Sequence, residues 1–426
     1  MSVDSFYQRT VFPNGLRILT VSMPHAHSVS VSLYVGTGSR YERDEEAGLS
    51  HFLEHVLFKG TQKRPTAKEI AEVIDGVGGM LNGGTDREYT VYYIKVAWPH
   101  LPLALEVLFD LVRWPLLDPA EVEKERQVVL EELAMVVDSP PQLADLLLDS
   151  ILWPDQPLGR DVAGTPDSVA GISREMALGY LHRQYVPNNI VVALAGNLSH
   201  QEMVDVIWQA LGDWPAGTPS LWFPAANGHG PRCAVRYKAT EQAHVCLALR
   251  GLALNHPDRY VLALLSIILG EGMSSRLFLE LRERRGLVYD VHSYVTHFLD
   301  TGAFGVYMGV DPIKAVQALQ LVLAELARLR EEDSHLGQEL AKARELAKGR
   351  LLLRMEDTRN VSGWVGGQEL LLGGVRSVEQ AVAEMEAVTL EDLQRLAREI
   401  IVPDQLHLAV VGPYKSDKRF VPLLRL

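Results

Sequence analysis

The pentapeptide H-F-L-E-H at residues 51–55 constrains this chain more than any other stretch. In an α-helix, His51 and His55 project from one face, one turn apart. Two imidazoles at this spacing can bind one tetrahedral Zn²⁺. Glu54 lies beside them, close enough to accept a proton from a water that the metal activates. The motif therefore predicts a helix that holds a metal ion and assists hydrolysis.

Histidine pairs at this spacing also occur by chance, so the residues around the motif matter. Phe52, Leu53, Val56 and Leu57 are apolar and predict a helix packed into the protein interior. Histidines on a buried helix need polar partners, and a metal ion is a natural one. The context favours a metal site over a coincidence.

A catalytic zinc ion usually takes three protein ligands and a water. A long helix predicted over residues 118–137 offers three carboxylates. The positions one turn away from Glu132 are valines, and a carboxylate on an apolar face is unfavourable unless it is paired or binds a metal. We predict Glu132 as the third ligand and Glu125, two turns earlier, as an outer carboxylate near a ligand histidine. Glu131 shares its face with Lys124 and Gln127, so an exposed charge is expected there.

Composition limits the class of protein. The 426 residues are 47% hydrophobic and 22% charged, as in a soluble globular protein of two or three domains. The net charge of −13 argues against a nucleic-acid partner. No apolar run is long enough to cross a membrane, and the first residues lack the pattern of a secretory signal. Cys233 and Cys246 do not form a metal-ligand spacing, and buried free thiols in a reducing cytoplasm are expected.

Hydrophobic periodicity and turn residues predict an α+β chain with antiparallel-rich sheets and helices packed on them. We expect two similar α/β sandwich domains, at residues 1–213 and 232–426, joined by a linker rich in Pro and Gly at 214–231. Besides the motif helix, helices are predicted at 66–75, 101–112, 118–137, 173–184, 200–211, 258–270, 274–284, 312–331 and 335–355. Strands are predicted at 10–12, 16–21, 29–35, 80–85, 89–96, 189–195, 234–239, 243–250 and within 289–310. The Asn14-Gly15 turn predicts that the first two strands form a hairpin, and Thr66 and Asp118 are predicted helix N-caps.

Four segments together resemble the pitrilysin-type zinc peptidases, or inverzincins, a family that includes insulysin and the mitochondrial processing peptidase. They are H-F-L-E-H at 51–55, G-G-M-L-N-G-G-T at 78–85, E-R-x-x-x-x-x-E at 125–132 and L-R-E-R-R-G-L-V-Y at 281–289. The resemblance covers nearly the whole chain and is to the half-length bacterial branch of the family.

The resemblance implies a zinc metalloendopeptidase that cleaves unfolded peptides or short polypeptides. His51, His55 and Glu132 would bind one Zn²⁺ per chain, and Glu54 would be the general base. Glu125 would be the outer carboxylate that supports the site.

The resemblance also implies residues that contact the peptide. Asn82 would lie on the sheet edge past which the substrate runs, although Gly83 stands where the family more often has Ala. Arg282 and Tyr289, seven residues apart, would contact the substrate near the scissile bond. Taken alone, Arg282 could be a surface charge and Tyr289 a core aromatic.

Chain length bears on assembly. Full-length members of the family fuse two halves of this size, one with the zinc motif and one with the Arg/Tyr pair. This chain carries both sets, which implies a clamshell homodimer in which each zinc site faces Arg282 and Tyr289 of the other subunit. Two alternatives stay open: a non-catalytic subunit like the core proteins of respiratory complexes, and one half of a heteromeric peptidase.

Overall fold

The computed structural model describes residues 6–226, 232–331 and 334–424. The chain forms two compact units, and each is built from separate segments. The first unit contains the segments ending at Leu133, Asp161–Phe223 and Leu352–Ser377. The second contains Ala134–Arg160, Pro224–Leu351 and the segment from Val378 onward.

The strands and helices of the structure follow the predicted pattern over residues 8–138 and 174–355, whereas the helices and the strand that the structure has at 140–171 and after 355 are not among the predicted elements. The strands are β1 (Gln8–Val11), β2 (Arg17–Ser22), β3 (Ser28–Val35), β4 (Met80–Thr85), β5 (Thr90–Ala97), β6 (Ile190–Gly196), β7 (Cys233–Tyr237), β8 (Ala243–Arg250), β9 (Val288–His297), β10 (Gly302–Val310) and β11 (His407–Gly412). The α-helices are α1 (Leu49–Leu57), α2 (Ala67–Asp75), α3 (Leu101–Arg113), α4 (Pro119–Asp138), α5 (Pro140–Leu152), α6 (Pro166–Gly171), α7 (Arg174–Gln184), α8 (His200–Leu211), α9 (Arg259–Gly270), α10 (Ala315–Arg330), α11 (Leu336–Arg354), α12 (Thr358–Leu372), α13 (Val378–Glu386) and α14 (Leu390–Ile400).

Local signals account for several of these elements. β1 and β2 form the predicted antiparallel hairpin, and Gly15 takes a φ of +87° in its turn. The Thr66 hydroxyl accepts a hydrogen bond from the Glu69 amide, and the Glu69 carboxylate bonds back to Thr66, which caps α2 as predicted. The predicted helix at 274–284 differs in form, because its main part, Phe278–Arg284, is π-helical.

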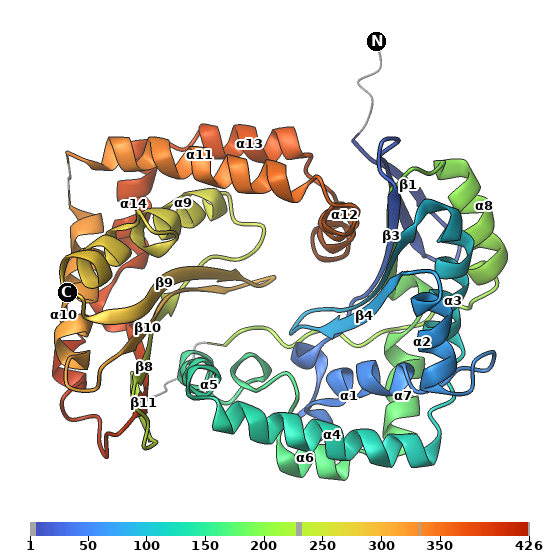
Figure 1. Cartoon of the computed structure of the whole chain (residues 1–426), viewed down its shortest axis with the longest axis horizontal. Coiled ribbons are helices and arrows are strands. Elements are labelled where there is room, and N and C mark those ends of the chain that lie inside the picture. The colour runs from blue at the N-terminus through green and yellow to red at the C-terminus, as the bar shows by residue number, and fades with distance from the viewer. Residues whose placement is uncertain (1–5, 227–231, 332–333, 425–426) are drawn as a thin grey trace. The chain divides into compact units, whose positions relative to one another are not determined.

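The first unit is built on a six-stranded sheet of order β1-β2-β6-β3-β5-β4. All neighbours are antiparallel except β2 and β6. β6 is buried along its whole length because both faces of the sheet are covered. Its alternate residues belong to two different cores, one shared with α3 and the other with α12. Figure 1 shows α3 and α12 on opposite sides of the sheet that contains β3 and β4. The strand order places β4 at one edge of the sheet.

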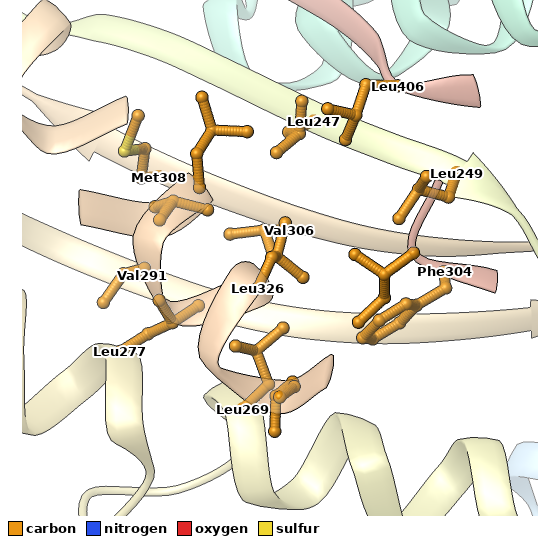
Figure 2. Packing of buried hydrophobic residues seen from close by; sticks show 14 of the residues in the cluster. Leu247, Leu249, Leu269, Leu277, Val291, Phe304, Val306, Met308, Leu326 and Leu406 are labelled. Atoms are coloured by element: carbon orange, nitrogen blue, oxygen red, sulfur yellow. The ribbon is translucent and has the colours of Figure 1, made fainter. Parts of the chain in front are cut away.

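The second unit is built on a five-stranded sheet of order β7-β11-β8-β10-β9. Val245, Leu247 and Leu249 on β8 point into a core shared with α9, α10 and α14, part of which Figure 2 shows. The alternating residues Cys246 and Ala248 pack on the opposite face, against α5.

The division into units differs from the predicted linear one, because two segments join the unit built mainly from the other half of the chain. α5 packs on β8 and β11 of the second unit, and α12 packs on β3 and β6 of the first. Each helix covers a sheet face that would otherwise expose apolar side chains to water. Of the predicted linker, residues 214–226 contain no helix or strand, and residues 227–231 lie outside the described residues.

The predicted class, an α+β chain with two sheet-and-helix domains, is confirmed. Cys233 and Cys246 are buried free thiols, as predicted. Among the described residues, no helix is long and apolar enough to span a membrane.

Candidate metal centre

The motif helix α1 is fixed at its N-terminus by a buried carboxylate. The side chain of Glu42 accepts hydrogen bonds from the amides of Gly48, at 2.8 Å, and Ser50, at 2.6 Å. Gly48 has a φ of +89°, and a Cβ there would overlap the carbonyl oxygen of Ala163. A carboxylate at this end satisfies free amides and interacts favourably with the helix dipole. Sequence reasoning did not identify this anchor.

Helix α4 carries the two glutamates that face α1. It begins at Pro119, where the Asp118 carboxylate accepts hydrogen bonds from the amides of Ala120 and Glu121. Glu125 and Glu132 lie seven residues apart, about 10.5 Å along the helix and close to two full turns. Both side chains therefore reach the same neighbouring helix.

The structure brings His51, His55 and Glu132 together. The Nε2 atoms of His51 and His55 are 3.3 Å apart. One carboxylate oxygen of Glu132, Oε2, lies 3.8 Å from Nε2 of His51 and 3.6 Å from Nε2 of His55. Within the part of the chain that the structure describes, this is the one cluster of at least three His, Cys, Asp or Glu side chains suited to a metal ion.

The three donor atoms fit the requirements of Zn²⁺. Tetrahedral coordination at about 2.1 Å separates neighbouring ligand atoms by roughly 3.4 Å, close to the distances found here. Burial, with a smaller contribution from His55, lowers the pKa of His51 to about 4. A neutral imidazole keeps the lone pair that a metal ion needs. The set of two nitrogens and one carboxylate oxygen is one that catalytic zinc sites use.

Glu132 was predicted as a ligand because the valines around it form an apolar helix face, and the structure supports this reason only in part. Val129, one turn before it, is fully buried, but Val128 is 40% exposed and the Glu132 side chain itself is 41% exposed. Glu132 thus lies at the border of the apolar face. An exposed position leaves room for a water or a substrate beside the three donor atoms. Glu131 is exposed, as predicted.

Glu125 contacts the outer side of His55. Its Oε2 lies 3.2 Å from Nδ1 of His55, and its Oε1 lies 2.8 Å from Nζ of Lys59. Because a carboxylate only accepts hydrogen bonds, this contact places the proton on Nδ1 and leaves Nε2 free to bind a metal. Sequence reasoning expected Glu125 near a ligand histidine but did not identify Lys59. The signal was present, since Lys59 continues the four-residue spacing of the two histidines.

Glu54 faces the edge strand β4. Thr85 Oγ1 donates a hydrogen bond of 3.3 Å to Glu54 Oε2. A Cβ at Gly83 would come within 2.8 Å of Glu54 Oε1, so the strand passes directly against this carboxylate. Burial raises the pKa of Glu54 above its usual value, while His55 and Thr85 lower it and Glu132 adds to the rise.

Asn82 lies on the same strand but on its other face. Side chains alternate along a strand, so Asn82 points away from the face that Gly83 and Thr85 turn toward Glu54. Its side chain is exposed, and its Oδ1 accepts a hydrogen bond from the following amide at 2.8 Å.

Arg282 and Tyr289 lie together in the second unit. The guanidinium carbon of Arg282 is 5.6 Å from the centre of the Tyr289 ring and 5.0 Å from that of Phe278. Tyr289 is 74% exposed at the start of β9, so it is not the core aromatic considered above. The pair forms an exposed cationic and phenolic surface.

Two family models match the chain. The model described as Insulinase (Peptidase family M16) matches residues 17–166, which include His51, Glu54, His55, Glu125 and Glu132. The model described as Peptidase M16 inactive domain matches residues 171–344, which include Arg282 and Tyr289.

Comparisons of whole chains agree with these matches. The chain is 37% identical over 407 residues to a Bacillus subtilis protein described as the uncharacterized zinc protease YmxG, covering 95% of this chain and 98% of the relative. Its fold matches a protease from Helicobacter pylori with a TM-score of 0.87 and 24% identity, over 96% and 99% of the two chains. It also matches a chain of complex III2 from Candida albicans with a TM-score of 0.84 and 22% identity, over 98% and 100%.

The insulinase family model, the relative named a zinc protease and the His-His-Glu cluster together indicate a protein of the metallopeptidase class. The chain belongs to peptidase family M16, as a half-length unit with the family's N-terminal and C-terminal domains.

Proposed function

We propose that this protein is a zinc metalloendopeptidase that hydrolyses peptide bonds in unfolded peptides or short polypeptides. The observation that carries the proposal is the convergence of His51, His55 and Glu132, with Glu54 beside them. These three ligands would hold one zinc ion per chain. Two free buried thiols fit a cytoplasmic protein.

The residues around the centre have different roles in the proposed reaction. A zinc ion held by His51, His55 and Glu132 would act as a Lewis acid on the scissile carbonyl and would lower the pKa of the attacking water. Glu54 takes the proton of the attacking water and passes it to the leaving amine. Its Oε2 is held by Thr85 Oγ1, so Oε1 is the oxygen left for the proton. Glu125 keeps His55 in the tautomer whose Nε2 faces the ligand cluster.

The substrate would bind along β4. This strand is at the edge of its sheet and runs past Glu54 at Gly83. An extended peptide added to this edge would bond through its main chain, which would favour unfolded substrates. Asn82, exposed on the strand, would contact a substrate side chain or its backbone.

A second copy of the chain would complete the site. In the proposed homodimer, Arg282 and Tyr289 of one subunit contact the peptide at the metal centre of the other. The Tyr289 hydroxyl would donate a hydrogen bond to the developing oxyanion, and Arg282 would hold the peptide backbone. Exposure of both side chains fits a role in contacting a bound peptide.

The test is Glu54→Gln in the purified chain. The amide keeps the shape of the side chain but cannot accept the proton, so peptide hydrolysis should fall by about 100-fold to 10,000-fold. The zinc content, measured by metal analysis, should stay at one ion per chain. Peptide cleavage is followed by mass spectrometry of a peptide library.

Glu72→Gln on α2 is the matched control, because Glu72 is exposed and pairs only loosely with Lys68 at 3.4 Å. Normal cleavage by Glu54→Gln would contradict the mechanism. A zinc-free, inactive wild-type chain would favour the non-catalytic subunit. A zinc-loaded chain that cleaves only after a different partner is added would favour a heteromeric peptidase.

A further inference from the structure

The inference concerns Lys59 and rests on the metal site proposed above. His51, His55 and Lys59 follow one another at intervals of four residues, so they occupy one face of α1 and its C-terminal extension. Helix α1 ends at Leu57 and Lys59 lies in the turn that follows it, where the amide of Lys59 donates to the carbonyl of Val56, three residues back, at 3.0 Å. Next to it, Gly60 lets the chain turn away, because a Cβ there would overlap the carbonyl oxygen of Pro65.

The facing helix α4 supplies a matching pair of carboxylates. Glu132 contacts both histidines at one end, and Glu125 contacts His55 and Lys59 at the other. The order of contacts means that α1 and α4 run in opposite directions where they face each other. His55 is the shared member, with Nε2 toward Glu132 and Nδ1 toward Glu125.

Glu125 is buried, with only 6% of its side chain exposed, and its two oxygens have different partners. Oε1 is 2.8 Å from Lys59 Nζ, and Oε2 is 3.2 Å from His55 Nδ1. The Lys59 side chain is 29% exposed, so its contact with Glu125 is partly shielded from water. A shielded ion pair with good geometry holds a carboxylate in one orientation better than an exposed pair does.

We propose that Lys59 is a positioning residue for the metal site. By binding Oε1, it turns the Glu125 carboxylate so that Oε2 meets the Nδ1–H of His55. That hydrogen bond orients the imidazole and directs Nε2 to the metal. Lys59 therefore sets zinc affinity through Glu125 without contacting the metal or the substrate.

The experiment measures zinc affinity by competition with a chromophoric chelator. Lys59→Met keeps the length and apolar stem of the side chain but loses the charge. We expect its zinc affinity to fall by about 10-fold to 100-fold, the range for outer partners of a ligand histidine. Lys59→Arg should restore most of the affinity, because a guanidinium can make the same contact with Glu125.

A double variant shows whether Lys59 acts through Glu125. Glu125→Gln should weaken zinc binding by itself, and Lys59→Met added to it should cause less than about a 2-fold further change. Lys63→Met is the matched control, because Lys63 is four residues further on and makes an exposed pair with Glu106. Its zinc affinity should equal that of the wild-type chain. Melting temperatures of all variants separate an effect on the site from loss of folding.

The outcomes distinguish the two proposals. A wild-type chain that binds zinc, with unchanged affinity in Lys59→Met, overturns the role of Lys59 and leaves the proposed function standing. The role is also overturned if Lys59→Met lowers zinc affinity by the same factor in the wild-type chain and in Glu125→Gln. Lys59 would then act by a route that does not pass through Glu125. A wild-type chain that binds no zinc, or binds it equally without His51 and His55, contradicts the proposed function itself. If Lys59→Met does not fold, Lys59→Arg is compared with Glu125→Gln instead. A zinc affinity as low in Lys59→Arg as in Glu125→Gln overturns the role of Lys59.

Discussion

At the scale of single residues, two facing helices decide which side chains meet. His51 and His55 lie four residues apart on α1, and Lys59 lies four residues further, in the turn after the helix. Glu125 and Glu132 lie seven residues apart on α4, an interval that keeps both side chains near one helical face. Sequence spacing alone indicated the histidines and both glutamates. The same spacing includes Lys59, but it does not indicate that Lys59 pairs with Glu125, since nothing in the sequence says which cation lies nearest to a given carboxylate.

Adjacent glutamates on α4 allow a direct test of this geometry. Glu132→Gln removes a charged ligand atom that lies 3.6 Å and 3.8 Å from the two imidazole nitrogens. The zinc affinity should fall by more than about 100-fold, more than for loss of an outer partner. Chelator competition gives the affinity, and metal analysis after dialysis gives the residual zinc content.

Glu131→Gln makes the same chemical change one position earlier. The side chain is exposed, so zinc affinity and peptide cleavage should both match the wild-type values. If the two variants lost zinc equally, or if Glu132→Gln kept it, a ligand role for Glu132 would be wrong.

At the scale of elements, the position of α12 on the first sheet depends on small and hydroxyl-bearing residues. Ser28 and Ser30 of β3 share hydrogen bonds of 2.9 Å with Thr358, and Ser32 bonds to Ser362 at 2.9 Å. The three serines alternate along β3, so they lie on one face of the strand. In the structure this face is buried, because α12 packs on it and supplies partners for the hydroxyl groups.

Two neighbouring glycines in α12 should respond in opposite ways to alanine. A Cβ at Gly366 would lie 2.7 Å from the Tyr34 ring and 2.9 Å from Ala193 Cβ, whereas at Gly367 the nearest atom of Tyr34 is 4.0 Å away. Gly366→Ala should overpack the contact, at a cost of about 1–3 kcal/mol that exceeds the gain in helix propensity. Gly367→Ala should gain up to about 1 kcal/mol.

Thermal unfolding followed by circular dichroism measures both variants against the wild-type chain. The melting temperature of Gly366→Ala should be lower and that of Gly367→Ala higher. Zinc affinity should not change in either folded variant, since neither glycine contacts a residue of the metal centre. Equal melting temperatures for the two variants would show that α12 does not approach β3 and β6 as closely as described.

At the scale of the whole molecule, the two motif sets lie in different units. The metal centre belongs to the first unit, and Arg282 and Tyr289 belong to the second. Each unit also contains residues from both halves of the sequence. Helix α5, from the first half, covers the sheet of the second unit, and α12, from the second half, covers the sheet of the first. A fragment cut at the predicted linker would leave each sheet without one of its covering helices.

Subunit mixing tests the proposed composite site. Glu54→Gln and the double variant Arg282→Ala/Tyr289→Phe should each be nearly inactive alone. When they are co-expressed in equal amounts, half of the dimers are mixed, and each mixed dimer has one intact site. With two-fold symmetry, peptide cleavage should recover to about a quarter of the wild-type rate.

Co-expression of Glu54→Gln with Glu132→Gln is the matched control. Both changes affect the same half of the composite site, so no mixed dimer has an intact one, and cleavage should stay near zero. Failure of the first pair to recover, or a monomeric mass for the wild-type chain, would rule out sites shared between two copies.

The local sequence determined the elements that carry the chemistry. Apolar periodicity, the Asn14-Gly15 turn and the caps at Thr66 and Asp118 act over a few residues, so they were visible without the fold. The same holds for the spacing of the motif on α1, because helical geometry relates neighbouring residues directly.

Only the tertiary structure decided which distant segments meet. The contact of Lys59 with Glu125, the anchoring of α1 by Glu42 and the packing of α5 and α12 join residues that local patterns do not relate. Such contacts depend on which apolar faces exclude water together, and that is a property of the whole packed chain.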